Sequence, residues 1–316
     1  MPHQKRISPA EIEAAGPPGQ LVGQLKSSTA TMEKKEWVAQ LLAALTAQDP
    51  SSAEKIVKVG AIGPLVALLS DGSENAKLHA ASAIASMTAG YPTHQEQVVR
   101  AGGIKPMVGL LSSGSAGTQE QAIHALASVS EDTTHQELIL KAGALKPVIN
   151  LLKGGKGHTQ VHAAASTANL ATHNPSAQAT VLDLGGIPLL LALLNSGKEK
   201  AQVQAARALS KLAHKNEEVQ ETIQDLDGIA PLLTMLNGRN IEGTVQAASA
   251  IAELARDNED AQDGVAMAGG IGPLLAMLAR TPATAAAQSN AASALAQLAR
   301  CAARHRNARF VFHVLP

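Results

Sequence analysis

The 316-residue sequence is poor in cysteine and in net charge, and each shortage excludes a class of protein. Cys301 is the one cysteine, so neither an intramolecular disulfide nor a cysteine-based zinc cluster can form. The 26 Lys and Arg balance the 26 Asp and Glu, whereas a general nucleic-acid binder needs an excess of phosphate-neutralising charge. We therefore expect a cytoplasmic or nuclear protein, and nucleic acid is not its expected partner.

Aromatic residues and long hydrophobic runs are also scarce. Aromatics make up 1% of the chain, so a core must be built from Ala, Leu, Ile, Val and Met. Such a composition favours close-packed helices over a β-sandwich. The best apolar stretch, Ile187 to Leu194, has under half of the ~20 residues needed to span a bilayer, so no membrane insertion is expected. Residues 1–19 contain no apolar signal segment and are predicted to be a flexible polar leader.

Internal repetition determines the expected architecture. The segment GAIGPLVALL begins at Gly60, and similar segments begin at Gly102, Gly143, Gly185, Asp227 and Gly269. The spacing of about 42 residues is typical of helical solenoids. Each repeat is predicted to contain a short first helix that ends at glycine, a second helix that begins near a proline, and an alanine-rich third helix.

These motifs resemble the armadillo repeat, through the G-x-I-x-P-L-x-x-L-L signature and a downstream alanine-rich segment such as AARALSKLA at Ala205 to Ala213. The sequence is most similar to the GAIPPLV-type arrays of plants and protists. The resemblance implies an all-α fold, a right-handed α-α superhelix or solenoid, with about six clear repeats and a weaker N-terminal one. HEAT repeats are the rival; they lack this glycine-bounded short helix. The repeat domain is expected to cover residues 20–299.

The C-terminal segment departs from the repeat pattern. Residues 264–316 contain five arginines and no acidic residue, a net charge of +5, while the preceding residues hold 21 basic against 26 acidic residues. We predict an irregular basic tail at residues 300–316. It suggests an alternative function, a nucleic-acid-associated protein that uses this tail, although a truncated array would explain the tail equally well. Cys301 lies among cations, but it is interpreted as a bystander at the chain end.

The motifs that carry catalysis are absent from the sequence. There is no phosphate-binding GxxxxGK[ST] loop, no HExxH zinc motif and no GxSxG elbow. His158 and His162 are spaced to share a helix face, but no third metal ligand accompanies them. We therefore predict neither an enzyme, nor a metal site, nor a cofactor.

The third helices are expected to line a concave groove. In peptide-carrying members of the family, an asparagine ladder and tryptophans four residues earlier bind the peptide. Of the asparagine positions only Asn169 is retained, with Lys211 and Glu253 at the positions of the next two repeats, and no tryptophan position is retained. This pattern argues against an importin-like carrier of nuclear localisation signals.

A second row, seven residues before the asparagine positions, is better preserved in type. Two helical turns separate the rows, so both share one helix face. After the first member, every residue carries an amide or an imidazole, which can both donate and accept hydrogen bonds to a main chain. An exposed helix start would also favour such residues. This row, which we call the polar row, consists of Trp37, His79, Gln121, His162, Gln204, Gln246 and Asn290.

The sequence thus predicts a non-catalytic protein-interaction scaffold, expected to be a monomer, that binds an extended or helical segment of a partner protein along the groove. Arg207 and Lys211 favour a partner with an acidic stretch, although solvated charges without a ligand fit equally well. The candidate groove residues are the seven of the polar row together with Asn169, Arg207, Lys211 and Glu253.

Overall fold

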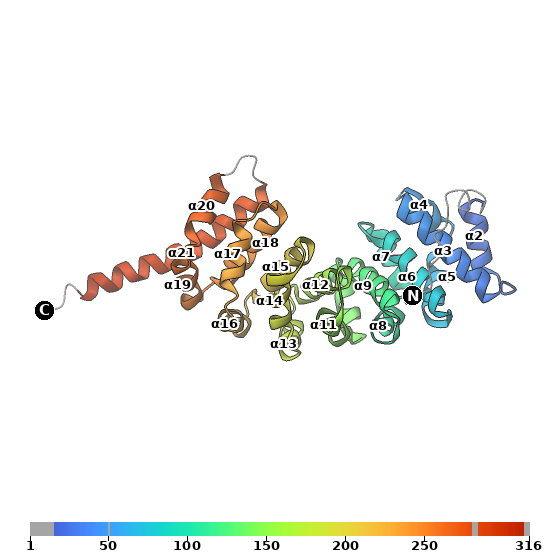
Figure 1. Ribbon diagram of the computed structural model, residues 1–316, viewed down its shortest axis with the longest axis horizontal. Coiled ribbons are helices and arrows are strands. Elements are labelled where there is room, and N and C mark those ends of the chain that lie inside the picture. Colours follow the sequence, from blue (N-terminus) through green and yellow to red (C-terminus); the bar gives the residue numbers. More distant parts are fainter. Residues whose placement is uncertain (1–15, 50, 280–283, 313–316) are drawn as a thin grey trace. The chain divides into compact units, whose positions relative to one another are not determined.

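The computed structural model describes residues 16–49, 51–279 and 284–312, and all regular structure in these ranges is helical (Figure 1). The prediction of an all-α fold is confirmed. The chain divides into two compact units, Met1–Leu151 (unit 1) and Leu152–Pro316 (unit 2). The proposed leader at residues 1–19 lies largely outside the described residues, and a helix already begins at Pro18.

The helices follow the predicted three-helix repeat. Two helices, α2 (Pro18–Lys26) and α3 (Met32–Gln48), precede six repeats. The first helices of the repeats are α4 (Ser51–Lys58), α7 (Pro92–Arg100), α10 (Thr133–Lys141), α13 (Pro175–Asp183), α16 (Glu217–Asp225) and α19 (Glu259–Met267). The second helices are α5 (Ile62–Asp71), α8 (Ile104–Ser113), α11 (Leu145–Gly154), α14 (Gly186–Ser196), α17 (Ile229–Leu236) and α20 (Ile271–Ala279). The third helices are α6 (Glu74–Thr88), α9 (Ala116–Val129), α12 (His158–Ala171), α15 (Glu199–Ala213), α18 (Ile241–Leu254) and α21 (Ala285–Phe312).

Backbone geometry explains the glycine and proline of each repeat. Gly102 has a φ of 78°, in the left-handed region that glycine tolerates, and its neighbour Gly103 donates its N–H to the Val98 carbonyl at 2.9 Å. These contacts close the first helix and turn the chain into the second. Pro106 then lies in the first turn of α8, where its missing N–H leaves no intrahelical bond unmade.

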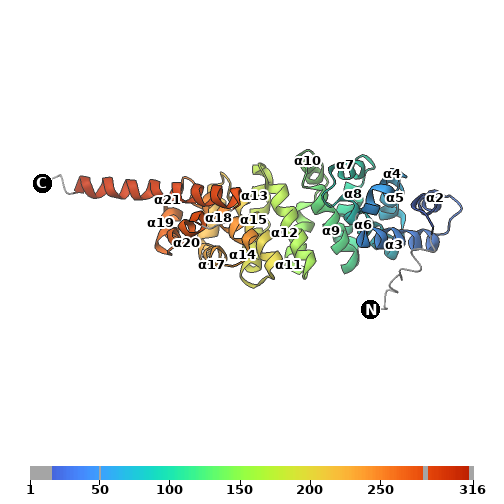
Figure 2. The ribbon, with the colours of Figure 1, turned by 90° about the horizontal axis from the view of Figure 1, so that it is seen from above.

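The third helices form the packed interior of each unit. In unit 1, α3 packs on α6 and α6 on α9; in unit 2, α12, α15, α18 and α21 pack on one another in that order (Figures 1 and 2). Small side chains such as Ala205 and Ala208 are fully buried, which lets neighbouring helices approach closely. Larger side chains, for example Leu126 in unit 1 and Leu209 in unit 2, fill the space between the layers and are also fully buried.

A buried glutamine recurs in the first helices and satisfies the carbonyl groups that end the third helices. Gln220, only 4% exposed, donates its amide to the Ala213 carbonyl at 3.1 Å and to the Glu253 carbonyl of the next third helix at 2.9 Å. Helix ends leave carbonyls without backbone partners, so these bonds stabilise both ends. We call the series the glutamine ladder; its members are Gln95, Gln136, Gln178, Gln220 and Gln262.

The prediction of an irregular segment at residues 300–316 is wrong for residues 300–312, which continue α21 as a helix. The cause is local: this stretch contains neither proline nor glycine, and its alanines and arginines are strong helix formers. Residues 313–316 lie outside the described part of the chain. Among the described helices, no single one is long and apolar enough to cross a membrane, although Pro175–Asp183 and Gly186–Asn195 meet that test as a pair bent by 78°.

Candidate functional site

In unit 1, the polar row places Trp37 on α3, His79 on α6 and Gln121 on α9, and all three side chains are partly buried. The Lys34 ammonium lies 4.0 Å from the centre of the Trp37 ring, a cation–π contact. Burial lowers the pKa of His79, although the nearby Glu36 carboxylate opposes this, so its imidazole is neutral near pH 7. Among the described residues, the Gln121 amide has no hydrogen-bond partner, so it can pair with a ligand.

In unit 2, the row runs across four successive third helices, with His162 on α12, Gln204 on α15, Gln246 on α18 and Asn290 on α21. All four are partly buried rather than fully exposed. Asn290 donates its amide to the Val245 carbonyl at 3.1 Å, which fixes its orientation. The side chain of Gln246 makes no hydrogen bond to any other described residue. The four residues lie on third helices that pack on one another in order.

The remaining candidate residues of unit 2 are placed differently from one another. Asn169 is only 4% exposed, and its Oδ1 accepts a hydrogen bond from Arg207 Nη2 at 2.5 Å. Arg207 Nη1 also donates to Gln204 Oε1 at 3.3 Å, so two neutral amides orient the guanidinium. The retained asparagine thus positions an arginine of the next helix, and its oxygen meets a ligand only if Arg207 moves.

Lys211 lies one turn after Arg207 on α15 and is partly buried. Its ammonium makes no ion pair with the described carboxylates. Together, Arg207 and Lys211, which we call the basic pair, place two cationic side chains on one face of α15. A ligand carboxylate on this face would be attracted by both of them.

Glu253 on α18 has the opposite charge, but its carboxylate is held by neighbouring side chains. Arg256 binds it through two nitrogens, each at 2.9 Å, and His214 Nδ1 lies 2.9 Å from Oε2. Burial by itself raises the pKa of Glu253, but the hydrogen bonds and charge of Arg256 and His214 outweigh burial and lower it. Glu253 is therefore ionised and internally paired, and it offers little attraction to a basic ligand.

Sequence reasoning missed His214 because its contact with Glu253 depends on the register between α15 and α18. It also missed Arg256, although the i, i+3 spacing to Glu253 is visible in the sequence. A further link, between the Ser210 and Ser249 hydroxyls at 2.9 Å, joins the same two helices. The serine at each of these positions looks unremarkable in the sequence. No signal in one sequence could have identified these contacts across repeats.

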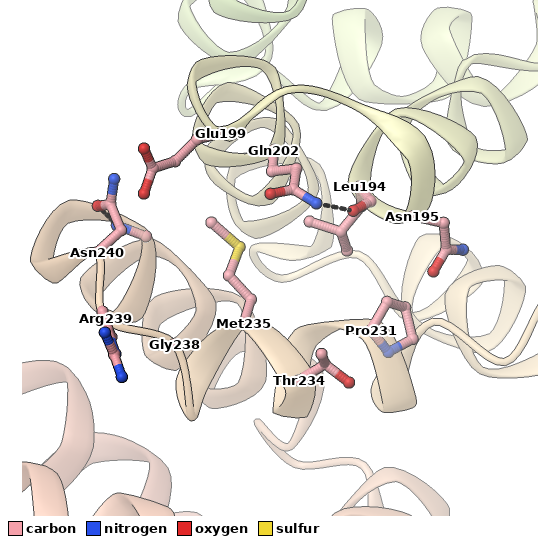
Figure 3. A pocket seen from close by; sticks show the side chains of 11 residues that line it. Leu194, Asn195, Glu199, Gln202, Pro231, Thr234, Met235, Gly238, Arg239 and Asn240 are labelled. Carbon is pink, nitrogen blue, oxygen red and sulfur yellow. Dashed lines mark hydrogen bonds between the residues drawn. The ribbon is translucent and has the colours of Figure 1, made fainter.

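Two hollows in unit 2 lie beside the loops between second and third helices. One, of about 290 Å³, is lined by residues of α14, α15, α17 and α18, and Met235 extends into it from α17 toward α15 (Figure 3). A Cβ added to Gly243 would lie 2.9 Å from the Met235 methyl, so a larger residue there would require the flexible Met235 side chain to shift. Gln202 donates to the Leu194 carbonyl at 2.9 Å, which commits its amide nitrogen (Figure 3). The other, of about 410 Å³, includes His158 and Lys198. Neither hollow contains a residue of the polar row.

His158 is exposed at the start of α12, and its ring stacks on that of His162 with centres 6.5 Å apart. Metal sites in proteins ordinarily use three or more protein ligands. No group of three such side chains occurs within the described ranges.

Comparisons with known proteins identify the repeat. Residues 92–130 and 174–214, which correspond to α7–α9 and α13–α15, match the Armadillo/beta-catenin-like repeat family. Among solved structures, the crystal structure of an engineered protein is 29% identical with a TM-score of 0.77, covering 92% of this chain and 70% of that chain. The designed armadillo repeat protein YIII(Dq)4CqI is 26% identical with a TM-score of 0.67, covering 75% of this chain and all of its own.

A further designed armadillo repeat protein, solved in complex with the peptide (KR)4, is 24% identical with a TM-score of 0.64. It covers 76% of this chain and all of its own length, and at this identity the likeness concerns the fold. No curated protein matches the sequence. The fold is an armadillo-repeat solenoid, as the sequence predicts, and it is similar to designed proteins that bind peptides.

Proposed function

We propose that this chain is a non-catalytic scaffold that binds a segment of a partner protein on the faces of its third helices. The observation that carries the proposal is the polar row, whose members are partly buried and lie on α3 and on each of the six third helices. The amides of Gln121 and Gln246 make no hydrogen bond within the described ranges. An amide can donate to a carbonyl and accept from an N–H, so it suits the backbone of an extended or helical segment.

The charges of unit 2 support a partner segment with an acidic stretch. Lys211 has no ion pair among the described residues, and it follows Arg207 on the same face of α15. Glu253, the acidic residue of the next third helix, is already bound by Arg256 and His214. The face therefore presents cationic groups without an equivalent acidic group.

This preference is opposite in sign to that of one designed relative, which was solved with the basic peptide (KR)4. The contrast makes the proposal specific to this chain, because the shared groove geometry does not determine whether the ligand is acidic or basic. The finer likeness to plant and protist arrays, the monomeric state and the cytoplasmic or nuclear location are parts of the same proposal.

The proposal is tested by affinity capture with mass spectrometry, using the intact chain, an Arg207→Glu/Lys211→Glu variant and a Lys198→Glu/Lys200→Glu control. The two variants change the net charge equally, and Lys198 and Lys200 are exposed residues outside the polar row. We expect partners that the intact chain and the control retain and that the basic-pair variant loses. The single variant Lys211→Glu, which breaks no side-chain hydrogen bond, guards against a folding defect.

Equal capture by all forms of the chain would contradict groove recognition. Capture that nuclease treatment abolishes, and that deletion of residues 300–316 also removes, would instead favour the nucleic-acid alternative. Strong dependence on salt would accompany that result, because phosphate contacts release counterions.

A further inference from the structure

The larger hollow of unit 2 combines buried apolar residues with exposed lysine side chains. Its volume of about 410 Å³ is within the range of sites that bind small molecules. Leu193 and Ala201, which are 6% and 4% exposed, contribute apolar surface. Lys198 and Lys200 line the hollow from the start of α15, and His158 lines it from the start of α12. The hollow can therefore hold the body of a compact ligand beside charged groups.

The charge around this hollow is mainly positive. The adjoining chain carries four lysines that are exposed and form no ion pair with a described carboxylate: Lys153, Lys156, Lys198 and Lys200. The first two belong to the sequence KGGKG at residues 153–157, directly before α12. Among the described residues, the carboxylate that lines the hollow is Glu199, which also lines the smaller hollow (Figure 3). Four lysines against one glutamate make an anion the expected ligand.

Lys198 occupies a position at which other repeats stabilise the fold. It is the N-cap residue of α15, whereas α6, α9 and α18 have Ser73, Ser115 and Asn240 there. In those three helices a side-chain oxygen accepts a hydrogen bond from the backbone N–H three residues later. Lys198 has a similar extended backbone, with φ −67° and ψ 157°, but its side chain forms no cap. It therefore contributes charge at the hollow instead of helix stability.

The concentration of lysines suits phosphate groups better than carboxylates. A phosphate carries up to about two negative charges and three acceptor oxygens, whereas a carboxylate carries one charge, so several phosphates match four lysines in a small volume. Gly157 also lines the hollow, with a φ of 55°, and no atom lies within 4 Å of the place where a Cβ would be. A ligand can thus approach the backbone at this glycine closely.

We propose that this hollow binds a small molecule that carries several phosphate groups on a compact ring. We call it the lysine hollow; the lining residues that define it are His158, Val161, Leu193, Lys198, Lys200 and Ala201. The phosphates lie beside the lysines, and the ring packs against the apolar residues. A soluble compound and the headgroup of a phosphorylated lipid share this chemistry. The proposal does not rest on the groove, since the hollow contains no residue of the polar row.

The test is isothermal titration calorimetry of the full chain with inositol hexakisphosphate. The main variant is Lys198→Ser/Lys200→Gln, and its control, Lys105→Ser/Lys146→Gln, removes the same charge from exposed positions of unit 1. Lys198→Ser alone is a second variant that guards against a folding defect. Because serine can cap α15 as Ser73 caps α6, this variant should have a raised melting temperature.

The intact chain should bind inositol hexakisphosphate. Lys198→Ser/Lys200→Gln should weaken binding by at least about tenfold, because two charged contacts are lost, while the control should change it by less than about threefold. Lys198→Ser should weaken binding although it melts at a higher temperature. Glu199→Gln should tighten binding, because the carboxylate repels phosphate. Absence of binding, or equal weakening by the control, would overturn the proposal.

Vesicles distinguish the two sources of the ligand. If the chain binds vesicles that contain phosphatidylinositol bisphosphate, and inositol hexakisphosphate displaces it, the ligand is a lipid headgroup. If it binds inositol hexakisphosphate but not these vesicles, the ligand is soluble. Equal binding to phosphatidylserine vesicles would overturn the proposal, because such a surface offers charge without clustered phosphates.

The groove variant separates this proposal from the proposed function. If Arg207→Glu/Lys211→Glu abolished binding of inositol hexakisphosphate while Lys198→Ser/Lys200→Gln left it unchanged, the phosphates would bind in the groove, and the proposal for the lysine hollow would be wrong. Loss of binding in Lys198→Ser/Lys200→Gln, with capture of groove partners retained, would support both proposals independently.

Discussion

The third-helix faces of the two units are built from the same repeat but are held in different ways. In unit 1 the polar row consists of Trp37, His79 and Gln121, and the imidazole is kept neutral by burial. Unit 1 has a polar contact between α6 and α3, from the Ser73 hydroxyl to the Glu36 carboxylate. In unit 2 such contacts link α12 to α15 and α15 to α18: Asn169 with Arg207, Ser210 with Ser249, and His214 with Glu253. Contacts of this kind preorganise charged groups, which lowers the cost of ordering them on binding. Within the proposed function, unit 2 is therefore the unit expected to select the charge of the ligand.

The largest effects should come from the buried leucines, which occupy the same repeat position in the two units. Leu126→Ala and Leu209→Ala should each lower the free energy of unfolding by about 2–5 kcal/mol, because each leaves a cavity. Since each repeat mainly contacts its neighbours, exchange of amide hydrogens should accelerate first in the unit that carries the change. Denaturant titration followed by hydrogen exchange would check this, and uniform acceleration along the chain would contradict it.

The glutamine ladder makes different hydrogen bonds in the two units. Gln220 of unit 2 joins the ends of α15 and α18, whereas Gln136 of unit 1 donates to the Ser130 carbonyl at the end of α9. Gln220→Ala should therefore cost about 1–3 kcal/mol, because two buried carbonyls lose a donor, and Gln136→Ala should cost less. Chemical denaturation of both variants is the measurement, and equal losses would show that the second bond in unit 2 adds no stability.

Removing an ion pair should destabilise unit 2 more than unit 1. Glu253→Gln in unit 2 weakens a partly buried pair with Arg256 and should cost about 1–3 kcal/mol. Glu96→Gln in unit 1 removes an exposed pair with Arg100 and should cost under about 0.5 kcal/mol. Thermal denaturation of the two variants checks the order, and a larger loss for Glu96→Gln would reverse it.

The pH dependence should differ between the units because the two perturbed groups titrate in different ranges. The folded pKa of His79 lies below its ordinary value of 6.5, so the unfolded chain binds the proton first as pH falls through 6.5, and unit 1 loses stability there. The folded pKa of Glu253 lies below 4.5, so its contribution is present above that pH and is lost as pH falls through the folded value. Melting temperatures measured across pH should show both losses of stability in the intact chain. His79→Gln should lack the loss below pH 6.5, and Glu253→Gln should lack the loss below pH 4.5.

The repeat made much of this fold predictable from the sequence. The recurring proline and glycine located the second helices and the turns before them, and the turn residue has positive φ even where Asp227 replaces glycine. These features are local, so one repeat reveals them and the period confirms them. Local propensity also explains the error at residues 300–312, where departure from the repeat was interpreted as loss of the helix.

The candidate site could be predicted only in part, because its contacts join residues from different repeats. The sequence locates the polar row on the third helices, but it does not show that Arg207 covers Asn169 or that His214 binds Glu253. These pairings depend on the register of helices some 40 residues apart in the chain. The glutamine ladder did leave a signal, a glutamine at nearly constant spacing, which the sequence reasoning did not use.

The most direct test of the central claim compares two short peptides of opposite charge on the intact chain. Fluorescence anisotropy would measure binding of (DE)4 and of (KR)4, the peptide carried by the designed relative. We predict that (DE)4 binds more tightly and that Arg207→Glu/Lys211→Glu reverses the preference, while Lys198→Glu/Lys200→Glu does not. A preference for (KR)4 by the intact chain, or a preference that the basic-pair variant leaves unchanged, would contradict it.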